Sequence, residues 1–365
     1  MQVKAIVDLF EHIAPGVYQE SYDNSGLITG YPDMEVTAIM LALDTTEEVV
    51  DEAISKGCNM IVAHHPIVFK GLKRFNGNNY VERTVIKAIK NNIAILAVHT
   101  NLDNVFRNGV NQKLASKLGL KDQQILAPKS GTLCKFFVYV PETHLETVKS
   151  AIFETGAGHI GNYTECSFTT IGEGTYKPID DAKPYSGENG IRSQVNEYKL
   201  EVILPVHIGS KVLKAVKTVH PYEEVAYEIY PLNNVHQEIG SGVIGNLPET
   251  MEKQAFLEYL KKALNLEIIR YTSGKEQISK VAVCGGSGSF LISDAKRSGA
   301  DAYVTADVKY HEFFDAENRL LLCDVGHYES EISTLEIFYE KIKEKFPNFA
   351  VIFCSISTNP IQYFK

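Results

Sequence analysis

Short apolar runs that alternate with amphipathic helical patterns restrict the fold of this 365-residue chain more than any other feature of its sequence. In the first third, buried strands are predicted at 36–43, 60–65 and 93–103, and helices at 46–56, 80–91 and 111–118. Strands separated by helices favour a parallel or mostly parallel sheet that is covered on both faces. The chain is therefore predicted to be an α/β protein.

The pattern changes near Pro128. Three strands are predicted at 135–141, 198–205 and 226–232, helices at 142–155 and 209–219, and short strand-like pieces over 156–178. The residues 179–194 form a polar excursion. The resulting order β-α-β-β-α-β is that of a ferredoxin-like α+β domain.

After about residue 236 the first pattern resumes. Helices are predicted at 252–264, 290–298 and 330–345, and strands at 280–286, 302–307, 319–327 and 350–357. We therefore expect one α/β domain built from 1–127 and 236–365, with residues 128–235 inserted between its halves.

Composition excludes several classes of protein. Hydrophobic residues make up 44% of the chain, which is enough for an ordinary core. No apolar run approaches the roughly 18–20 residues of a membrane span. The first fifteen residues carry Asp8 and Glu11 and predict an amphipathic helix rather than a signal peptide. Six scattered cysteines are typical of buried thiols in a reducing compartment, so a cytoplasmic location is expected.

The formal net charge of −9 makes the chain a poor general binder of phosphate backbones. Nucleic acid is therefore not an expected partner.

Four apolar strands run into polar residues that can bind metals. Their sequences are MIVAHHP, LAVHTNLDN, AYVTADVKYH and LLLCDVGHYESE. Ligands of open α/β sheets gather at the carboxyl ends of the strands. The four loops are therefore expected to build one site at one edge of a sheet.

Five residues in these loops are candidate metal ligands. Consecutive His64 and His65 stand where a strand ends and can each face one of two ions. His327 and Glu331 are four residues apart at a helix start, on one helical face, and Asp103 ends another strand-to-loop run. Each has an ordinary alternative, as a surface histidine, a helix-start acid or a turn cap. Together they supply mixed nitrogen and oxygen ligands for two divalent ions.

Other polar residues surround this set. His99, Asp307 and His311 are candidates for orienting the ligands or for transferring protons. The glycine-rich residues 284–289 can cradle an anion or simply form a tight turn. No arrangement of residues indicates a nucleophilic serine or cysteine.

In combination, several motifs resemble the Nif-three-like proteins, many of which are labelled GTP cyclohydrolase 1 type 2 homologues. They are YQESYDNSGLITG, MIVAHHP, HTNLDN, TADVKYH and DVGHYESE. The resemblance implies a three-layer α/β domain and a dinuclear site whose ligands match the five residues above, with Glu331 bridging. It also implies a toroidal homohexamer. Tyr22 stands where many members have tryptophan, a change that should not disturb the metals.

The inserted residues, with GAGHIGNYTECSF and VHPYEEVAYEIYPL, resemble the PII-like or CutA-like module of longer bacterial members. In the family, such modules cover the openings of the toroid.

We therefore expect two divalent ions per subunit, zinc first, with iron or manganese as alternatives. The leading hypothesis is a metal-dependent hydrolase acting on a nucleotide-like ring or a phosphate ester. The alternative is a regulatory or scaffold hexamer in which the inserted domain senses a small ligand.

Overall fold

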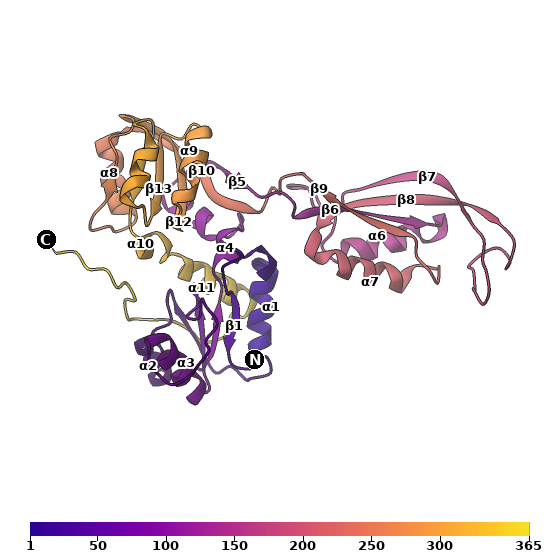
Figure 1. Cartoon of the computed structure of the whole chain (residues 1–365), viewed down its shortest axis with the longest axis horizontal. Helices are drawn as coiled ribbons and strands as arrows, with labels where there is room; N and C mark the ends of the chain where they lie inside the picture. Colours follow the sequence, from indigo (N-terminus) through magenta and orange to yellow (C-terminus); the bar gives the residue numbers. More distant parts are fainter. Residues whose placement is uncertain (365) are drawn as a thin grey trace. The chain divides into compact units, whose positions relative to one another are not determined.

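A computed structural model describes residues 1–364 and divides the chain into two compact units (Figure 1). One unit joins residues 1–127 to the chain from Glu238 onward, and the other is Pro128–Gln237. The sequence placed the joints after residues 127 and 235. Both units are mixed assemblies of helices and sheets.

The first unit contains a five-stranded sheet. In spatial order its strands are β1 (Gly26–Thr29), β4 (Ala94–Ala97), β3 (Met60–Ala63), β2 (Ile39–Ala42) and β15 (Val351–Phe353). The four strands from β4 to β15 run parallel, and β1 is antiparallel to β4. Because Val351 pairs with Ile39, the two ends of the chain share this sheet.

Helices cover both faces of the five-stranded sheet. They are α1 (Val3–Ile13) and α11 (Thr334–Lys345) on one face, and α2 (Glu47–Ser55) and α3 (Tyr80–Lys90) on the other. Successive strand residues alternate between the faces, so Leu41 packs with Phe338 of α11 and Met40 packs with Val50 of α2. This burial on both faces explains the continuously apolar strands.

The same unit contains a second sheet, of six strands. In spatial order they are β11 (Arg270–Tyr271), β14 (Leu321–Asp324), β13 (Ala302–Ala306), β12 (Gln277–Ser287), β10 (Gly240–Glu252) and β5 (Lys121–Pro128). The three central strands β12, β13 and β14 are parallel. Its faces are covered by α5 (Val110–Lys117) and α8 (Lys253–Ala263), and by α9 (Ile292–Arg297) and the 3₁₀ helix η5 (Tyr310–Ala316).

Three local expectations for the first unit were wrong. The strand-end loops lie on two sheets, and not along one edge of a single sheet. Asp103 ends a short helix, α4 (Thr100–Asp103), rather than lying in a loop. The helix expected over 330–345 is two helices, α10 (His327–Glu331) and α11, because the chain bends at Ile332–Ser333.

The second unit is a four-stranded antiparallel sheet with two helices. Its elements are β6 (Leu133–Val140), α6 (Leu145–Phe153), β7 (Ser167–Tyr176), β8 (Ser193–Pro205), α7 (Gly209–Val219) and β9 (Tyr227–Leu232). The spatial order is β7–β8–β6–β9. Residues 167–176 form one continuous strand instead of the short pieces expected. Val148 and Val212 of the helices pack on Phe136 and Leu200, which gives this unit its own core.

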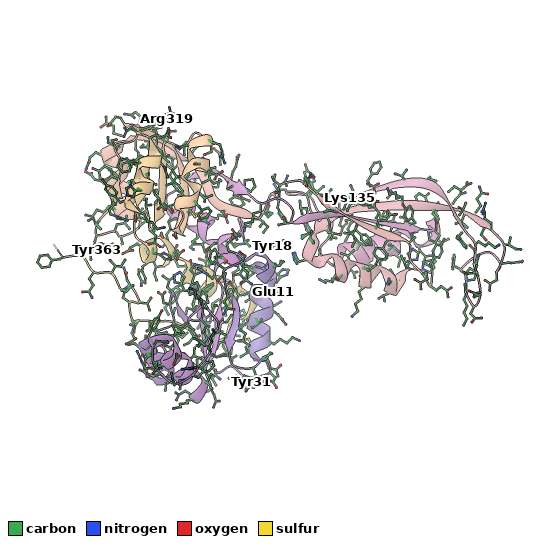
Figure 2. The ribbon with its side chains drawn as sticks, viewed as in Figure 1. Glu11, Tyr18, Tyr31, Lys135, Arg319 and Tyr363 are labelled. Carbon is green, nitrogen blue, oxygen red and sulfur yellow. The ribbon has the colours of Figure 1, made fainter. Side chains whose placement is uncertain are left out.

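Three further features are the state of the cysteines, the length of the helices and the course of the C-terminal segment. All six cysteines are present as free thiols. Among residues 1–364, none of the helices is both long and apolar enough to cross a membrane. After β15 the chain continues without helix or strand, past Tyr363 (Figures 1 and 2).

Candidate metal centre

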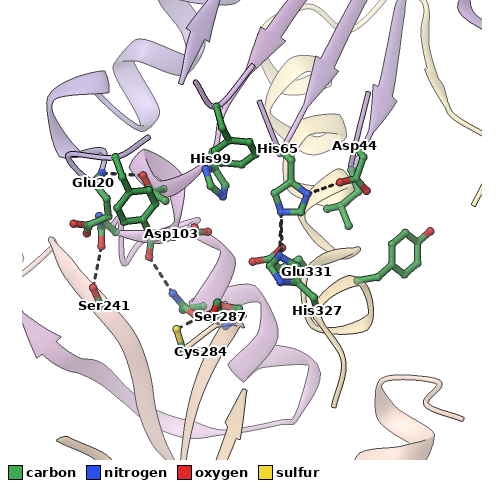
Figure 3. Close-up of a pocket in the computed structure, with 18 of the residues that line it drawn as sticks. Glu20, Asp44, His65, His99, Asp103, Ser241, Cys284, Ser287, His327 and Glu331 are labelled. Atoms are coloured by element: carbon green, nitrogen blue, oxygen red, sulfur yellow. Dashed lines mark hydrogen bonds and ion pairs between the residues drawn. The ribbon is translucent and has the colours of Figure 1, made fainter. Parts of the chain in front are cut away.

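The two sheets of the first unit direct the ends of their strands at one cavity of about 440 Å³ (Figure 3). His64 and His65 directly follow β3, and His99 follows β4. From the other sheet, α10 contributes His327 and Glu331 shortly after β14. Residues more than 220 positions apart in the sequence therefore meet around one space.

Three ligand atoms meet on one side of the cavity. His65 Nε2 lies 3.0 Å from Glu331 Oε2 and 3.2 Å from His327 Nε2. His327 Nε2 is also 3.0 Å from the same carboxylate oxygen. Figure 3 shows these three side chains pointing toward one another. Two imidazole nitrogens and one carboxylate oxygen form a typical partial ligand set for a divalent ion.

A second group shares Glu331. His64 Nε2 lies 3.6 Å from Asp103 Oδ1 and 3.8 Å from Glu331 Oε2. Within the described chain, His64 Nε2 and Asp103 Oδ1 are buried and have no hydrogen-bond partner. Buried polar atoms are normally paired, so two such atoms without hydrogen-bond partners, facing each other, are arranged to bind a cation. In each group the ligand atoms lie within 4.8 Å of one another, and these residues can hold a metal ion.

Every histidine at the cavity is oriented by an acceptor at its Nδ1 atom. The pairs are His64 with the Val98 carbonyl (2.8 Å), His65 with Asp44 (2.7 Å), His327 with Asp307 (2.7 Å) and His99 with Asp23 (2.8 Å). A bond at Nδ1 selects the tautomer and turns Nε2 toward the cavity. The four rings are thus held in fixed orientations at the cavity.

The carboxylates and imidazoles perturb one another. Burial lowers the pKa of His65 and of His327, but hydrogen bonds to Asp44, Asp307 and Glu331 outweigh it and raise the two values to about 9 and about 11. Burial would raise the pKa of Glu331, yet the neighbouring histidines hold it well below its usual range. Without a metal, the cluster therefore pairs protonated imidazoles with ionised Glu331.

His99 belongs to a separate network. Its Nδ1 donates to Asp23, which also accepts from the backbone N–H of Thr100 (3.0 Å) and the hydroxyl of Ser25 (2.9 Å). Burial would raise the pKa of Asp23, but the bond and charge of His99 hold it below its usual range. His99 is also packed edge-on against Phe69, with ring centroids 5.6 Å apart. This ring is held firmly beside His64 and His65.

The structure brings some of the surrounding candidates to the site and not others. Asp307 bonds to Nδ1 of His327, the ring nitrogen opposite the one that faces the cavity. His311 is exposed, its ring contacts Tyr310 and Phe314, and it does not line the cavity. Sequence reasoning missed Asp23 and Asp44. Asp44 is the second residue after β2, as His65 is the second residue after β3, so the strand-end pattern could have identified it.

Two backbone amides of the glycine-rich residues 284–289 already have partners beside the cavity. Gly285 N–H donates to Asn111 and Gly286 N–H donates to Ser330 Oγ. Gly286 has a φ of +60°, and a Cβ there would lie 2.2 Å from Glu331 Oε1. Only glycine lets the backbone approach the shared carboxylate this closely.

Fold and site together define a mixed α/β protein with a buried histidine–carboxylate cluster that can hold a metal ion. The family model described as Duf34/NIF3 (NGG1p interacting factor 3) matches residues 1–360. The chain therefore belongs to the Duf34/NIF3 family.

Curated relatives and solved structures agree with this assignment. A Halalkalibacterium halodurans protein named "GTP cyclohydrolase 1 type 2 homolog" is 39% identical over 99% of this chain and 98% of its own. One of the same name from Bacillus subtilis is 41% identical over 90% and 88%. A Bacillus cereus protein related to NIF3 matches with a TM-score of 0.86 at 40% identity, over 100% of this chain and 99% of that structure.

Replacing Gly286 with alanine tests the close approach to Glu331. The positive φ alone should cost about 1–2 kcal/mol of unfolding free energy, and the new methyl group should also displace Glu331 and lower the bound metal content. Gly299→Ala is the matched control, because Gly299 has a φ of +75° and open space at its Cβ. Urea unfolding and elemental analysis measure both effects. Equal metal content in the two variants would contradict the role of Gly286.

Metal binding should release protons at pH 7.5. His65 and His327, with pKa values of about 9 and about 11, are protonated in the metal-free protein at that pH. A metal ligand must be a neutral imidazole, so both protons must leave. Apparent affinity should therefore rise with pH through about 9, where His65 loses its proton, and continue to rise less steeply towards about 11, where His327 loses its own. Titration calorimetry in two buffers of different ionisation enthalpy measures the release, and identical heats in both would refute it.

Proposed function

We propose that this chain is a metal-dependent hydrolase with two divalent ions at one site. The ligands proposed are His64, His65, Asp103, His327 and Glu331. The observation that supports this most is that Glu331 Oε2 belongs to both ligand groups, while His64 Nε2 and Asp103 Oδ1 are buried without partners. A carboxylate shared in this way is suited to bridging two ions.

When bound, such ions lower the pKa of a water molecule and polarise the bond that is attacked. The chain's own residues have separate tasks. His99, held at Nδ1 by Asp23, presents Nε2 to the cavity and can accept and return a proton. Asp44 and Asp307 keep the His65 and His327 rings in place.

The choice of metal follows from the ligand types. Three imidazoles with two carboxylates suit zinc, and iron or manganese as alternatives. Elemental analysis of the purified protein decides between them.

A nucleotide-like ring is the substrate class we favour over a simple phosphate ester. Relatives carry the name "GTP cyclohydrolase 1 type 2 homolog". Tyr22, Phe69 and Phe290 line the same cavity as the ligands. Aromatic side chains bind flat rings by stacking and edge contacts.

Substituting His64 or His65 with alanine tests the hydrolase directly. Each variant should lose bound metal and, in a screen of nucleotides and phosphate esters with the metal found, lose more than about 100-fold in rate, beyond the effect of residues that only orient a ligand. His311→Ala is the control, because His311 is an exposed histidine outside the cavity. Hydrolysis that persists unchanged after the metal is lost would rule out the proposal.

The second unit supports a second candidate function, a regulatory or scaffold protein. Residues 128–237 have the element order β-α-β-β-α-β and a core of their own, which the cavity residues do not use. We propose that they form a ferredoxin-like, PII-like or CutA-like module that senses a small ligand, in a homohexamer whose metals stabilise the assembly.

Deleting residues 128–237 separates the two functions. The ends of the segment are close, since His236 N–H donates to the Lys129 carbonyl at 2.8 Å, so a short glycine–serine linker can replace it. If the chain is a hydrolase, the truncated protein should keep its bound metal and its rate of hydrolysis. If the chain is a sensor, the truncated protein should lose its response to small ligands. Light scattering on both proteins reports the assembly size. Unchanged ligand response and size in the truncated protein would count against the sensor.

A further inference from the structure

The segment that follows β15 is fastened to the first sheet by a buried carboxylate. Glu52 of α2, 8% exposed, accepts hydrogen bonds from the Ser355 N–H (3.0 Å), the Ser355 hydroxyl (2.6 Å) and the Cys354 thiol (2.9 Å). Several donors converge on one acceptor, so the start of this segment has a defined path. The chain leaves β15 in a fixed direction toward the metal centre.

A few residues later the segment reaches the orienting groups of the site. The Thr358 hydroxyl donates to Asp44 Oδ2 at 2.6 Å. The other oxygen of Asp44, Oδ1, accepts from His65 Nδ1 at 2.7 Å. A hydroxyl, a carboxylate and an imidazole thus form one chain of hydrogen bonds that ends at a proposed ligand.

The next residue, Asn359, bonds the segment to α10, the helix that follows β14 of the second sheet. Asn359 Nδ2 donates to Glu329 Oε1 at 2.9 Å. Glu329 lies in α10, between the proposed ligands His327 and Glu331. Asn359 and the following Pro360 line the cavity itself. Residues 355–359 therefore contact the groups behind ligands from both sheets.

We propose that Thr358 is a positioning residue for the metal centre, acting through Asp44 on His65. This inference rests on the proposed metal site. Asp44 is about one-third exposed, and a carboxylate held only by His65 could rotate or bind water at its second oxygen. The Thr358 hydroxyl occupies that oxygen, so the imidazole keeps the orientation in which Nε2 faces His327 and Glu331. The C-terminal segment thereby completes the site.

The test is Thr358→Val in the full-length protein, which keeps the shape of the side chain and removes the hydroxyl. Zn²⁺ affinity is measured by competition with a chromophoric chelator, and the visible spectrum of the Co²⁺-loaded protein reports the geometry at the ligands. One of the bound ions should bind roughly tenfold more weakly, the effect typical of losing a group that orients a ligand, and the Co²⁺ spectrum should shift.

Two control variants test whether the effect comes from the Thr358 hydroxyl. Thr358→Ser retains the donor and should restore wild-type affinity. Ser357→Ala removes an exposed hydroxyl one residue earlier on the same segment and should change nothing. Wild-type affinity and spectrum in Thr358→Val would overturn the inference.

A double-mutant cycle shows whether Thr358 acts through Asp44. Thr358→Val should have no further effect in an Asp44→Ala background, and additive losses of affinity would overturn the inference. A wild-type protein that binds no Zn²⁺ would overturn the proposed function together with it. Wild-type binding with an unaffected Thr358→Val variant would reject the positioning role alone.

Discussion

The hydrogen bond at the Nδ1 atom of each cavity histidine is the interaction on which the site depends. Four imidazoles gather at one cavity, and each is held by a carbonyl or a carboxylate behind it. Because the back of each ring is occupied, each Nε2 must face the cavity. A bound cation would offset the cost of burying His64 Nε2 and Asp103 Oδ1 without hydrogen-bond partners.

The residues of the cavity come from both halves of the first unit, which are separated in the sequence. One sheet delivers His64, His65 and Asp103, and the other delivers His327 and Glu331. The strand β15 returns to the first sheet after α11, so the end of the chain passes the cavity a second time. Residues 128–237 lie between these halves in sequence and form their own core, which is why an insertion at this point leaves the site intact.

The strand-end pattern predicted most of the residues that the structure brings together at the cavity, because these residues follow buried strands, and such strands are easily recognised. It missed Asp44 because one aspartate after a strand is usually a turn or cap residue. It missed Asp23 and Thr358 because neither follows a strand with other ligands; their partners lie about 76 and 314 positions away. It also assigned the four loops to one edge, since periodicity reveals strands but not which sheet they join.

By itself, the sequence determined the α/β class and the five candidate ligands, because the local pattern of residues reveals burial on both faces of a strand and the chemistry of each side chain. Only the tertiary structure decided that residues from two sheets border one cavity, that Glu331 is common to two ligand groups and that the C-terminal segment reaches Asp44. These depend on the packing of distant segments, as where the hydroxyl of Thr358 donates to the carboxylate of Asp44, 314 residues away in the sequence.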